Sequence, residues 1–268
     1  MQLIDIGVNL MSPVFDPDRE AVAAAAAAAG ISPLVITGSS LESSAAALAF
    51  AEAHEQGLFC ATTGVHPHNA RFWTGSAAGG IAELRRLASH GAAAALGECG
   101  LDYNRMFSPP DSQRRCFEDQ LELAAELGKP VFLHERDAFE DFYALLEKYR
   151  PRLSAAVVHC FTGTERELDA CLGLDCYIGV TGWICDERRG AHLIPLVKKI
   201  PPDRLLLETD APYLLPRSLP RGRSGGRNEP RHLPHIANFI ARALDKDAET
   251  LAAETFRNSV AFFGLTGI

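Results

Sequence analysis

The feature of this sequence that most constrains its fold is a regular alternation of short apolar segments with longer segments of helical character. The short segments are rich in aliphatic and β-branched residues and often end at glycine, which is typical of buried strands. They cover residues 3–8, 33–38, 58–64, 93–98, 130–135, 155–161, 176–182 and 204–210. The helix-like segments that follow them in turn cover residues 16–29, 41–56, 80–90, 111–127, 137–149, 165–171, 187–199 and 233–244.

Strands that alternate with helices are expected to run parallel, because each helix carries the chain back across the sheet. Eight such units in 268 residues match the size of a closed (β/α)₈ barrel, the TIM barrel. An open doubly wound sheet is the competing architecture. A last helix over residues 248–263 would pack outside the barrel. An apolar content of 47% suffices for one large core, and nothing marks a linker, so we expect a single domain over residues 1–268.

Chemically active side chains stand at the ends of four predicted strands, where a barrel places its catalytic groups. Taken alone, each of these residues is more often structural, either as a histidine whose hydrogen bonds are made within the protein or as the cap of a turn. Two imidazoles and two carboxylates at one barrel mouth are costly to desolvate unless they are paired or bind a metal. Mixed nitrogen and oxygen donors favour a divalent cation over a structural zinc site. The four residues are Glu98, His134, His159 and Asp210.

The seven cysteines are scattered and include no Cys-x-x-Cys pair. This usage argues against a disulfide framework and favours the reducing cytoplasm. Cys99 and Cys160 adjoin two of the predicted metal ligands, but strand alternation predicts that their side chains face the helices as packing residues. The first ten residues contain no basic leader, and the alanine tract at 23–29 is too short to cross a bilayer. We therefore expect no signal peptide and no membrane span.

Six motifs resemble, in their order, those of the TatD family of metal-dependent deoxyribonucleases. They are GVHPH, GECGLDY, VFLHERDA, VVHCFTGT, ETDAPYL and RNEPRHLPHI, and the similarity runs from about residue 3 to residue 264. The resemblance implies a TIM barrel of the metallo-dependent hydrolase type and a metal held by the same four strand-end residues. It also implies a magnesium-dependent 3′–5′ exonuclease that acts on single-stranded DNA and RNA, with a role in DNA repair.

One motif departs from the family pattern. Family members commonly open the first strand with Asp-x-His-x-His, whereas this chain keeps Asp5 but has Gly7 and Asn9 in the histidine places. Gly7 cannot bind a metal, and Asn9 offers only an amide oxygen. We therefore expect one well-held ion, with Asn9 in a supporting position. The loss of two imidazoles shifts the site toward oxygen donors, which favours Mg²⁺ or Mn²⁺ over Zn²⁺.

An arginine-rich segment follows the eighth predicted strand, although the formal net charge of the chain is −8. The segment RSLPRGRSGGRNEPR, residues 217–231, contains five arginines and one glutamate. In a barrel it lies at the same mouth as the predicted metal, and a planar guanidinium can bind two phosphate oxygens at once. We expect at least two of these arginines to contact nucleic-acid phosphates. Solvated loop arginines are the alternative.

Further residues are assigned roles around the expected phosphodiester. Asp210 is expected to bind the metal and to accept the proton of the attacking water, and His66 and Glu98 are expected to be catalytic. Glu208, two residues before Asp210, is a candidate partner for a metal-bound histidine. The expected substrate-binding residues are His68, Asp102, Arg136, Arg227, Asn228 and Glu229. A structural role for His68 is an equally open alternative.

Two other functions compete with a nuclease. A small-molecule amidohydrolase or phosphotriesterase uses the same barrel, but such sites usually need the strand-one histidines and often a bridging lysine. The nearest lysine, Lys129, precedes the fifth predicted strand. The second alternative is a nucleic-acid-binding protein with a purely structural metal. Our expectation is a cytoplasmic, monomeric enzyme that acts on single-stranded DNA or RNA.

Overall fold

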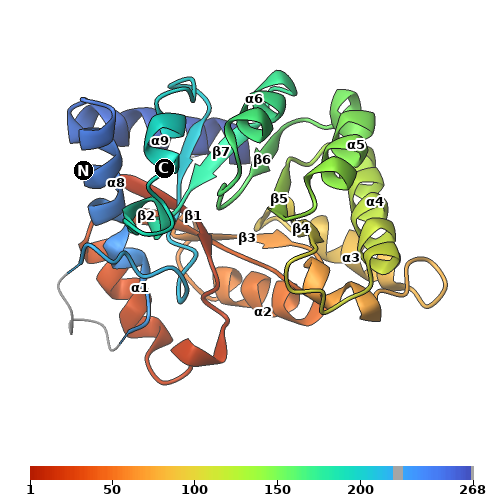
Figure 1. Cartoon of the computed structure of the whole chain (residues 1–268). Helices are drawn as coiled ribbons and strands as arrows, with labels where there is room; N and C mark the ends of the chain where they lie inside the picture. Colours follow the sequence, from red (N-terminus) through yellow and green to blue (C-terminus); the bar gives the residue numbers. More distant parts are fainter. Residues whose placement is uncertain (220–225, 267–268) are drawn as a thin grey trace.

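The computed structural model describes residues 1–219 and 226–266, and within them eight parallel strands form one sheet in chain order (Figure 1). The strands are β1 (Leu3–Val8), β2 (Ile31–Ile36), β3 (Phe59–Thr63), β4 (Ala93–Asp102), β5 (Val131–Arg136), β6 (Ala156–Val158), β7 (Tyr177–Val180) and β8 (Leu205–Leu207). The last strand meets the first: the Asp210 amide donates to the Gly7 carbonyl at 2.9 Å, and Val8 bridges Ala211 in parallel. The predicted TIM barrel is confirmed.

A helix follows each strand, and the helices lie around the outside of the strands (Figure 1). They are α1 (Arg19–Ala28), α2 (Leu41–Glu52), α3 (Gly80–Ala88), α4 (Pro110–Leu127), α5 (Phe139–Tyr149), α6 (Glu165–Gly173), α7 (Leu193–Val197) and α8 (Leu233–Ala243), with α9 (Ala248–Phe263) closing the order. Short 3₁₀ turns lie in several of the connecting loops, η1 (Pro13–Phe15), η2 (Pro67–Phe72), η3 (Arg150–Arg152), η4 (Gly182–Cys185) and η5 (Pro230–His232). No helix in the described part of the chain is long and apolar enough to cross a membrane.

The apolar core has two layers, as the strand pattern requires. One cluster takes buried side chains from seven of the eight strands, and Tyr177 of β7 packs against it, which is possible only inside the ring. Ile6, Phe132 and Leu206 belong to this cluster. Phe262 and Phe263 at the end of α9 pack against this cluster. The larger cluster joins the strands to the surrounding helices. The barrel is thus filled by side chains below its carboxyl end, and the polar residues described next lie above that filling.

Most predicted element boundaries hold within a few residues, and α9 has the predicted bounds. The predicted helix over 187–199 was wrong, because only Leu193–Val197 is α-helical. Asp186 causes the difference: its side chain accepts hydrogen bonds from the backbone and guanidinium of Arg188 and from Arg189, which folds residues 186–190 into a turn. The sixth and eighth strands also end earlier than predicted, at Val158 and Leu207.

Candidate metal centre

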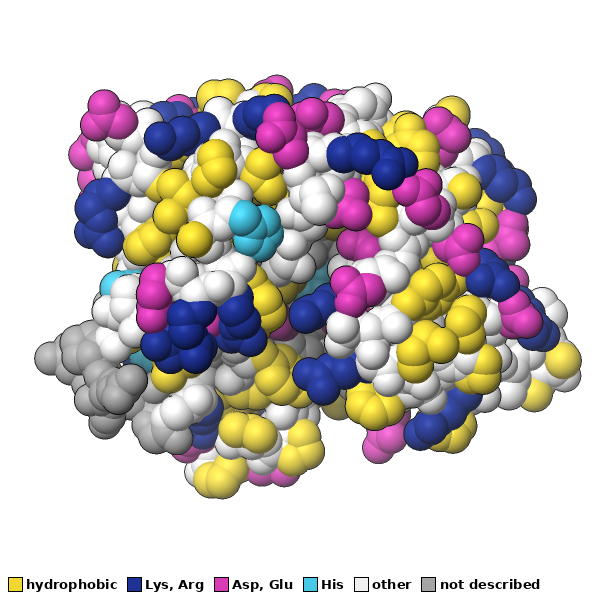
Figure 2. Space-filling model, in the orientation of Figure 1, with side chains coloured by type: hydrophobic (Ala, Val, Ile, Leu, Met, Phe, Trp, Pro, Cys, Tyr) yellow, Lys and Arg dark blue, Asp and Glu magenta, His cyan; other side chains and the backbone are white. Residues whose placement is uncertain are grey.

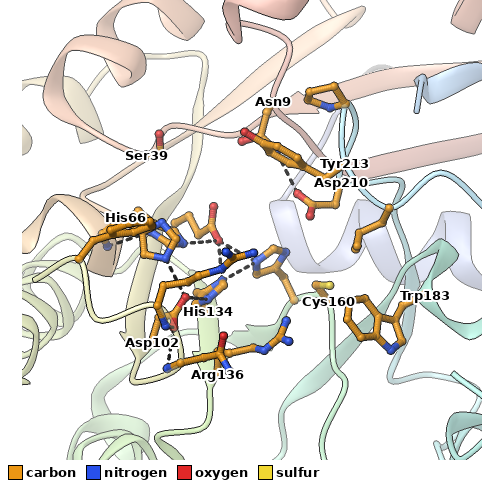
Figure 3. A pocket seen from close by; sticks show the side chains of 18 of the residues that line it. Asn9, Ser39, His66, Asp102, His134, Arg136, Cys160, Trp183, Asp210 and Tyr213 are labelled. Atoms are coloured by element: carbon orange, nitrogen blue, oxygen red, sulfur yellow. Dashed lines mark hydrogen bonds and ion pairs between the residues drawn. The ribbon is translucent and has the colours of Figure 1, made fainter. Parts of the chain in front are cut away.

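A cavity of about 740 Å³ opens at the carboxyl ends of the strands. Figure 2 shows it as a hollow with Lys and Arg side chains at its edge, and Figure 3 shows side chains that line it. The predicted site residues that line it are Asn9, His66, His68, Glu98, Asp102, His134, Arg136, His159 and Asp210. Glu208, Arg227, Asn228 and Glu229 do not belong to the lining. Most of the site residues predicted from the sequence therefore lie at the same end of the barrel.

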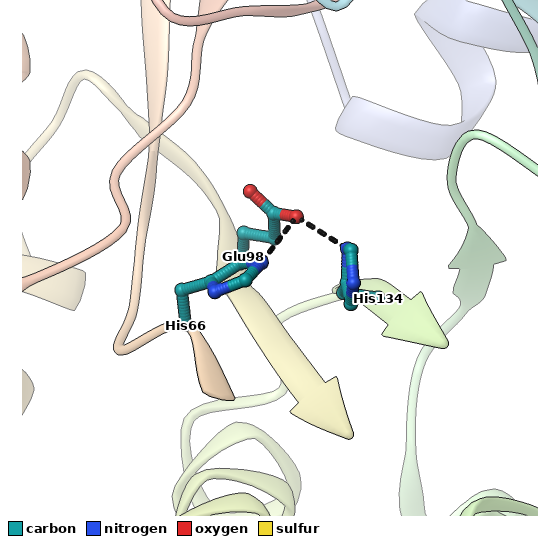
Figure 4. Close-up of side chains that lie close together, drawn as sticks. All are labelled: His66, Glu98 and His134. Atoms are coloured by element: carbon teal, nitrogen blue, oxygen red, sulfur yellow. Dashed lines mark ion pairs between the residues drawn. The ribbon is translucent and has the colours of Figure 1, made fainter. Parts of the chain in front are cut away.

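Three imidazoles converge on a single carboxylate oxygen at the centre of this cavity. Glu98 Oε1 lies 2.8 Å from His134 Nδ1 and 3.3 Å from His66 Nε2 (Figure 4). The same oxygen lies 2.8 Å from His159 Nε2. Glu98 and His134 project from the strands β4 and β5, whereas His66 and His159 lie just beyond β3 and β6. Because parallel strands end at the same edge, four neighbouring strand ends bring these side chains together.

The charges of this group strongly perturb its proton affinities. Burial alone would raise the pKa of Glu98, but His66 and His159 and the hydrogen bonds from His134 and His159 hold that pKa well below its usual value. Burial opposes charge on His159 as well, yet Glu98 and Glu208 raise the pKa of this imidazole well above its usual value. A buried carboxylate that draws this much positive charge toward itself is suited to hold a cation.

His66 differs from its neighbours in tautomer and charge. Its Nδ1 accepts the backbone N–H of His68 at 3.0 Å, so the neutral ring carries its proton on Nε2, which points at Glu98. Burial lowers the pKa of His66 to about 4, against the charge of Glu98. His66 is therefore arranged as a neutral hydrogen-bond donor.

Glu208 orients His159 from below the cavity, as the sequence suggested. Its carboxylate is fully buried and lies 3.1 Å from His159 Nδ1, and the Cys160 backbone N–H donates to it at 2.5 Å. Two glycines leave room for it: a Cβ at Gly7 or at Gly179 would lie 2.5 Å from a Glu208 oxygen. Gly7, which removes one histidine of the family pattern, thus makes space for the carboxylate that positions another histidine.

Asp210 lies beside Asn9, on the side of the cavity away from His66 (Figure 3). The Asn9 amide donates to Asp210 Oδ1 at 2.9 Å, which gives Asn9 the supporting position expected of it. Burial raises the pKa of Asp210 to about 7, although His159 opposes this shift. Below Asp210, the buried Asp5 accepts hydrogen bonds from the backbone and hydroxyl of Thr209 and so fixes the end of β8.

The donors around Glu98 fit a divalent cation. Ligand atoms of His66, Glu98 and His134 all lie within 4.8 Å of one another, and His159 Nε2 is in contact with the same carboxylate oxygen. His134 Nε2 is buried and has no hydrogen-bond partner in the described part of the chain. Carboxylate oxygens suit Mg²⁺ and Mn²⁺, and imidazole nitrogens suit Zn²⁺ and other transition metals, so a mixed set of this kind can hold a divalent cation. A neutral His159 can keep its proton on Nδ1 toward Glu208 and offer Nε2 to a metal, whereas a neutral His66 carries its proton on Nε2. His159 is therefore a better nitrogen ligand than His66.

The polar rim of the cavity contains further predicted residues. His68 Nε2 lies 2.7 Å from Asp102 Oδ2, so this histidine is held by a carboxylate and remains partly exposed. Arg136 lines the cavity with its guanidinium 5.2 Å from the Trp183 ring centroid, and Arg189 stacks on the same ring at 4.3 Å. No carboxylate of the described residues pairs with Arg136, which leaves its charge available to a phosphate.

The arginine-rich segment reaches the cavity at Gly226, but its described arginines form ion pairs elsewhere. Arg217 pairs with Glu187, and Arg227 pairs with Asp18 and Glu229 while it covers the Phe15 ring. Arg231 also pairs with Glu229, and Asn228 is buried with its amide donating to the Thr209 carbonyl at 2.9 Å. These residues tie the loop after β8 to the barrel and do not line the cavity. Arg221 and Arg223 lie outside the described residues.

Several lining residues were not predicted from the sequence, among them Cys160 and Ser39. Cys160 lines the cavity, with its sulfur 3.6 Å from Thr181 Oγ1, so the prediction that it faces the helices was wrong. The strand ends at Val158, and Cys160 has a φ of 46°, so strand alternation no longer applies there. Cys99 is fully buried in the large core cluster, as predicted. Ser39, beyond β2, also lines the cavity; its position after a strand was the available signal.

Comparison with known proteins connects this geometry to a family. The profile of the TatD-related DNase family matches residues 4–264. The chain belongs to this family. It is 51% identical over 264 residues to a protein of Erwinia tasmaniensis named 3′-5′ ssDNA/RNA exonuclease TatD, covering 98% of this chain and 100% of the relative. The protein of the same name from Edwardsiella piscicida is 52% identical with the same coverage.

Solved structures agree in fold. A hydrolase of the TatD family from Entamoeba histolytica superimposes with a TM-score of 0.87 at 26% identity, covering 98% of both chains. An uncharacterized amidohydrolase from Saccharomyces cerevisiae gives the same TM-score at 25% identity, covering 98% of this chain and 100% of the other. The barrel is therefore shared with proteins much less similar in sequence than the bacterial relatives.

Proposed function

We propose that this chain is a metal-dependent nuclease that removes nucleotides from the 3′ end of single-stranded DNA or RNA. The observation that carries the proposal is the convergence of His134 and His159 on Glu98, in a cavity shared with Asp210, in a chain of the TatD family. The names of relatives about 50% identical over the whole chain support the polarity and the single-stranded substrate.

The proposed metal is Mg²⁺, with Mn²⁺ and Zn²⁺ as the alternatives, and its proposed ligands are Glu98, His134, His159 and Asp210. When bound, such an ion supplies Lewis-acid polarisation of the phosphate and increases the acidity of water. Gly7 and Asn9 in place of the family histidines support one ion, because the β1 side of the cavity offers an amide that is already bonded to Asp210.

The protein's own side chains supply orientation and proton transfer. Glu208 fixes the His159 ring through Nδ1 and leaves Nε2 facing Glu98. The Nε2–H of His66 donates toward the phosphate when a substrate occupies the cavity. Asp210, which lines the same cavity, accepts the proton of the attacking water.

Phosphate binding is proposed for the cavity arginines without carboxylate partners. Arg105 and Arg136 both line the cavity, and neither forms an ion pair with a carboxylate in residues 1–219 and 226–266. His68 and Asp102 border the substrate as a pair. Arg227, Asn228 and Glu229 hold the loop after β8 and act on the substrate through its position.

The cellular setting is also a proposal. The chain acts as a single catalytic domain over residues 1–268, as a cytoplasmic monomer that takes part in the repair of damaged DNA. All seven cysteines are free thiols, which suits a reducing compartment. A small-molecule hydrolase is the weaker candidate, because the cavity lining offers neither a bridging lysine nor strand-one histidines.

An end-labelled single-stranded oligonucleotide incubated with Mg²⁺ tests the proposal. We expect a ladder that shortens from the 3′ end and stops when a chelator is added. Asp210→Asn should lower the rate about 10²–10⁴-fold while the circular dichroism spectrum stays unchanged. Glu187→Gln, a rim carboxylate outside the cavity, is the matched control. Wild-type protein that hydrolyses lactones or amides but leaves every oligonucleotide intact would exclude a nuclease.

A further inference from the structure

The exposed large hydrophobic side chains of the described residues share one location. Each of them follows a strand at the barrel's carboxyl end, in the loops after β1, β3, β4 and β8. Isolated exposed apolar residues are ordinary, but their restriction to the catalytic face points to a surface that binds something. They are Val14 (50% exposed), Phe72 (68%), Met106 (48%), Phe107 (52%) and Tyr213 (57%).

Phe107, Arg71 and Phe72 form a continuous strip that leads outward from the cavity. Phe107 lines the cavity, and its ring packs edge-on against His68 with centroids 4.7 Å apart. Arg71 Nη1 donates to the Phe107 carbonyl at 3.1 Å, and the Arg71 guanidinium lies 4.7 Å from the centroid of the Phe72 ring. We call these three residues the aromatic strip.

The aromatic strip is held in place before any ligand binds. The buried Ser108 hydroxyl accepts the Arg71 backbone N–H at 3.0 Å and donates to the His68 carbonyl at 2.9 Å. Gln113, also buried, donates to the Ser108 carbonyl at 2.8 Å. The loops after β3 and β4 are therefore joined as one unit, and a ligand would not have to order them.

The order of side chains in the strip fits a single nucleic-acid strand. Exposed aromatic rings stack on unpaired bases of any sequence, and a guanidinium between them can meet the backbone phosphate that links two bases. Arg71 pairs with no carboxylate in the described ranges, so its charge is not already neutralised. A duplex keeps its bases stacked on one another and offers this surface no free base face.

We propose that the aromatic strip binds the retained part of the substrate, the nucleotides on the 5′ side of the bond that is cut. This assignment rests on the proposed function, because the polarity of cleavage decides which part of the strand remains bound. The terminal nucleotide occupies the cavity near Glu98, the next base stacks on Phe107, and a following base stacks on Phe72.

Substrate length provides the test. The ratio of kcat/KM for a thymidine hexanucleotide to kcat/KM for the dinucleotide reports contacts beyond the cavity. Phe72→Ala should lower this ratio about tenfold, since one base–aromatic stack has that order of effect. Phe72→Tyr should keep the wild-type ratio. Val14→Ala should keep it too, because it removes another exposed apolar side chain on the same face but outside the strip. An unchanged ratio in Phe72→Ala overturns the assignment.

A binding assay distinguishes the contribution of the aromatic strip from that of the catalytic residues. Anisotropy of a labelled thymidine hexanucleotide, with chelator present to prevent cleavage, should show about tenfold weaker affinity for Phe72→Ala. If wild-type protein cleaves no oligonucleotide but this affinity still falls, the proposed nuclease function fails and the strip stands as a nucleic-acid-binding surface. If the wild type cleaves and the affinities are equal, the strip is refuted and the nuclease stands.

Discussion

A methyl group added at Gly7 should disturb the carboxylate that orients His159. A Cβ at Gly7 would lie 2.5 Å from Glu208 Oε2 and 3.1 Å from Phe132 Cζ. Glu208 and Phe132 are both fully buried, and Gly179 approaches the opposite Glu208 oxygen in the same way, so the carboxylate has no free space to enter. Gly7→Ala therefore forces Glu208 away from the ring nitrogen that it contacts.

Two separate magnitudes follow from this collision. Overpacking of a filled interior costs about 1–3 kcal/mol of unfolding free energy. Loss of the partner that orients a metal-binding histidine lowers metal affinity or activity about 10–100-fold. Urea unfolding measures the first quantity, and titration with Mn²⁺ together with oligonucleotide cleavage measures the second. Glu208→Gln should reproduce the second effect with a smaller change in packing, because the two side chains have nearly the same shape.

Gly91→Ala is the control, since nothing lies within 4 Å of a Cβ built at that position. It should leave stability, metal affinity and cleavage near their wild-type values. A Gly7→Ala protein that is destabilised as expected, yet binds metal and cleaves like the wild type, would refute the argument that Glu208 acts on the site through His159.

Two further predictions concern charge. Burial raises the pKa of Asp5 to about 7 against hydrogen bonds from Thr209, so Asp5 should reduce the stability of the metal-free protein as the pH rises from about 4 to about 7, because the unfolded chain releases this proton near pH 4. Asp5→Asn should therefore gain stability relative to the wild type over this range, while the similarly shifted Asp210 keeps its own contribution in both proteins. Urea unfolding at several pH values measures the difference, and parallel pH curves for the two proteins would contradict it. Arg136→Ala should weaken oligonucleotide binding and reduce the slope of log affinity against log salt concentration by about 0.7. Arg227→Ala should instead cost about 0.5–3 kcal/mol of unfolding free energy, because it removes the ion pair with Asp18, and should leave that slope nearly unchanged. The reverse result would restore the arginine-rich loop as the phosphate site.

The architecture was predictable because its signals are local. Buried parallel strands appear as short aliphatic runs, and their alternation with helical segments allows few topologies. The side chains at strand ends were predictable for the same reason: once the barrel is granted, Glu98, His134 and His159 must share one mouth. The helix α9 has the predicted bounds, and in the structure the Asp247 side chain caps its first turn by accepting the Thr250 backbone N–H.

The sequence was less informative where contacts between distant residues decide the outcome. The partners of Arg217 and Arg227 are Glu187 and Asp18, which belong to other loops, so these ion pairs could not be predicted from local sequence. The turn at Asp186 replaced a predicted helix for the same reason. Cys160 escaped the alternation rule because a left-handed backbone conformation follows directly after a strand of three residues.

The junction between the first and last strands of the barrel determines when the site can form during protein synthesis. Asn9 and Asp210 are separated by 201 positions, yet they form one hydrogen bond at the junction of the first and last strands. During synthesis the aspartate reaches the ribosome exit long after the asparagine has emerged, so a stalled or proteolysed fragment cannot assemble the centre. A chain that ends before residue 210 lacks one of the proposed metal ligands, so cleavage is expected only from the completed barrel.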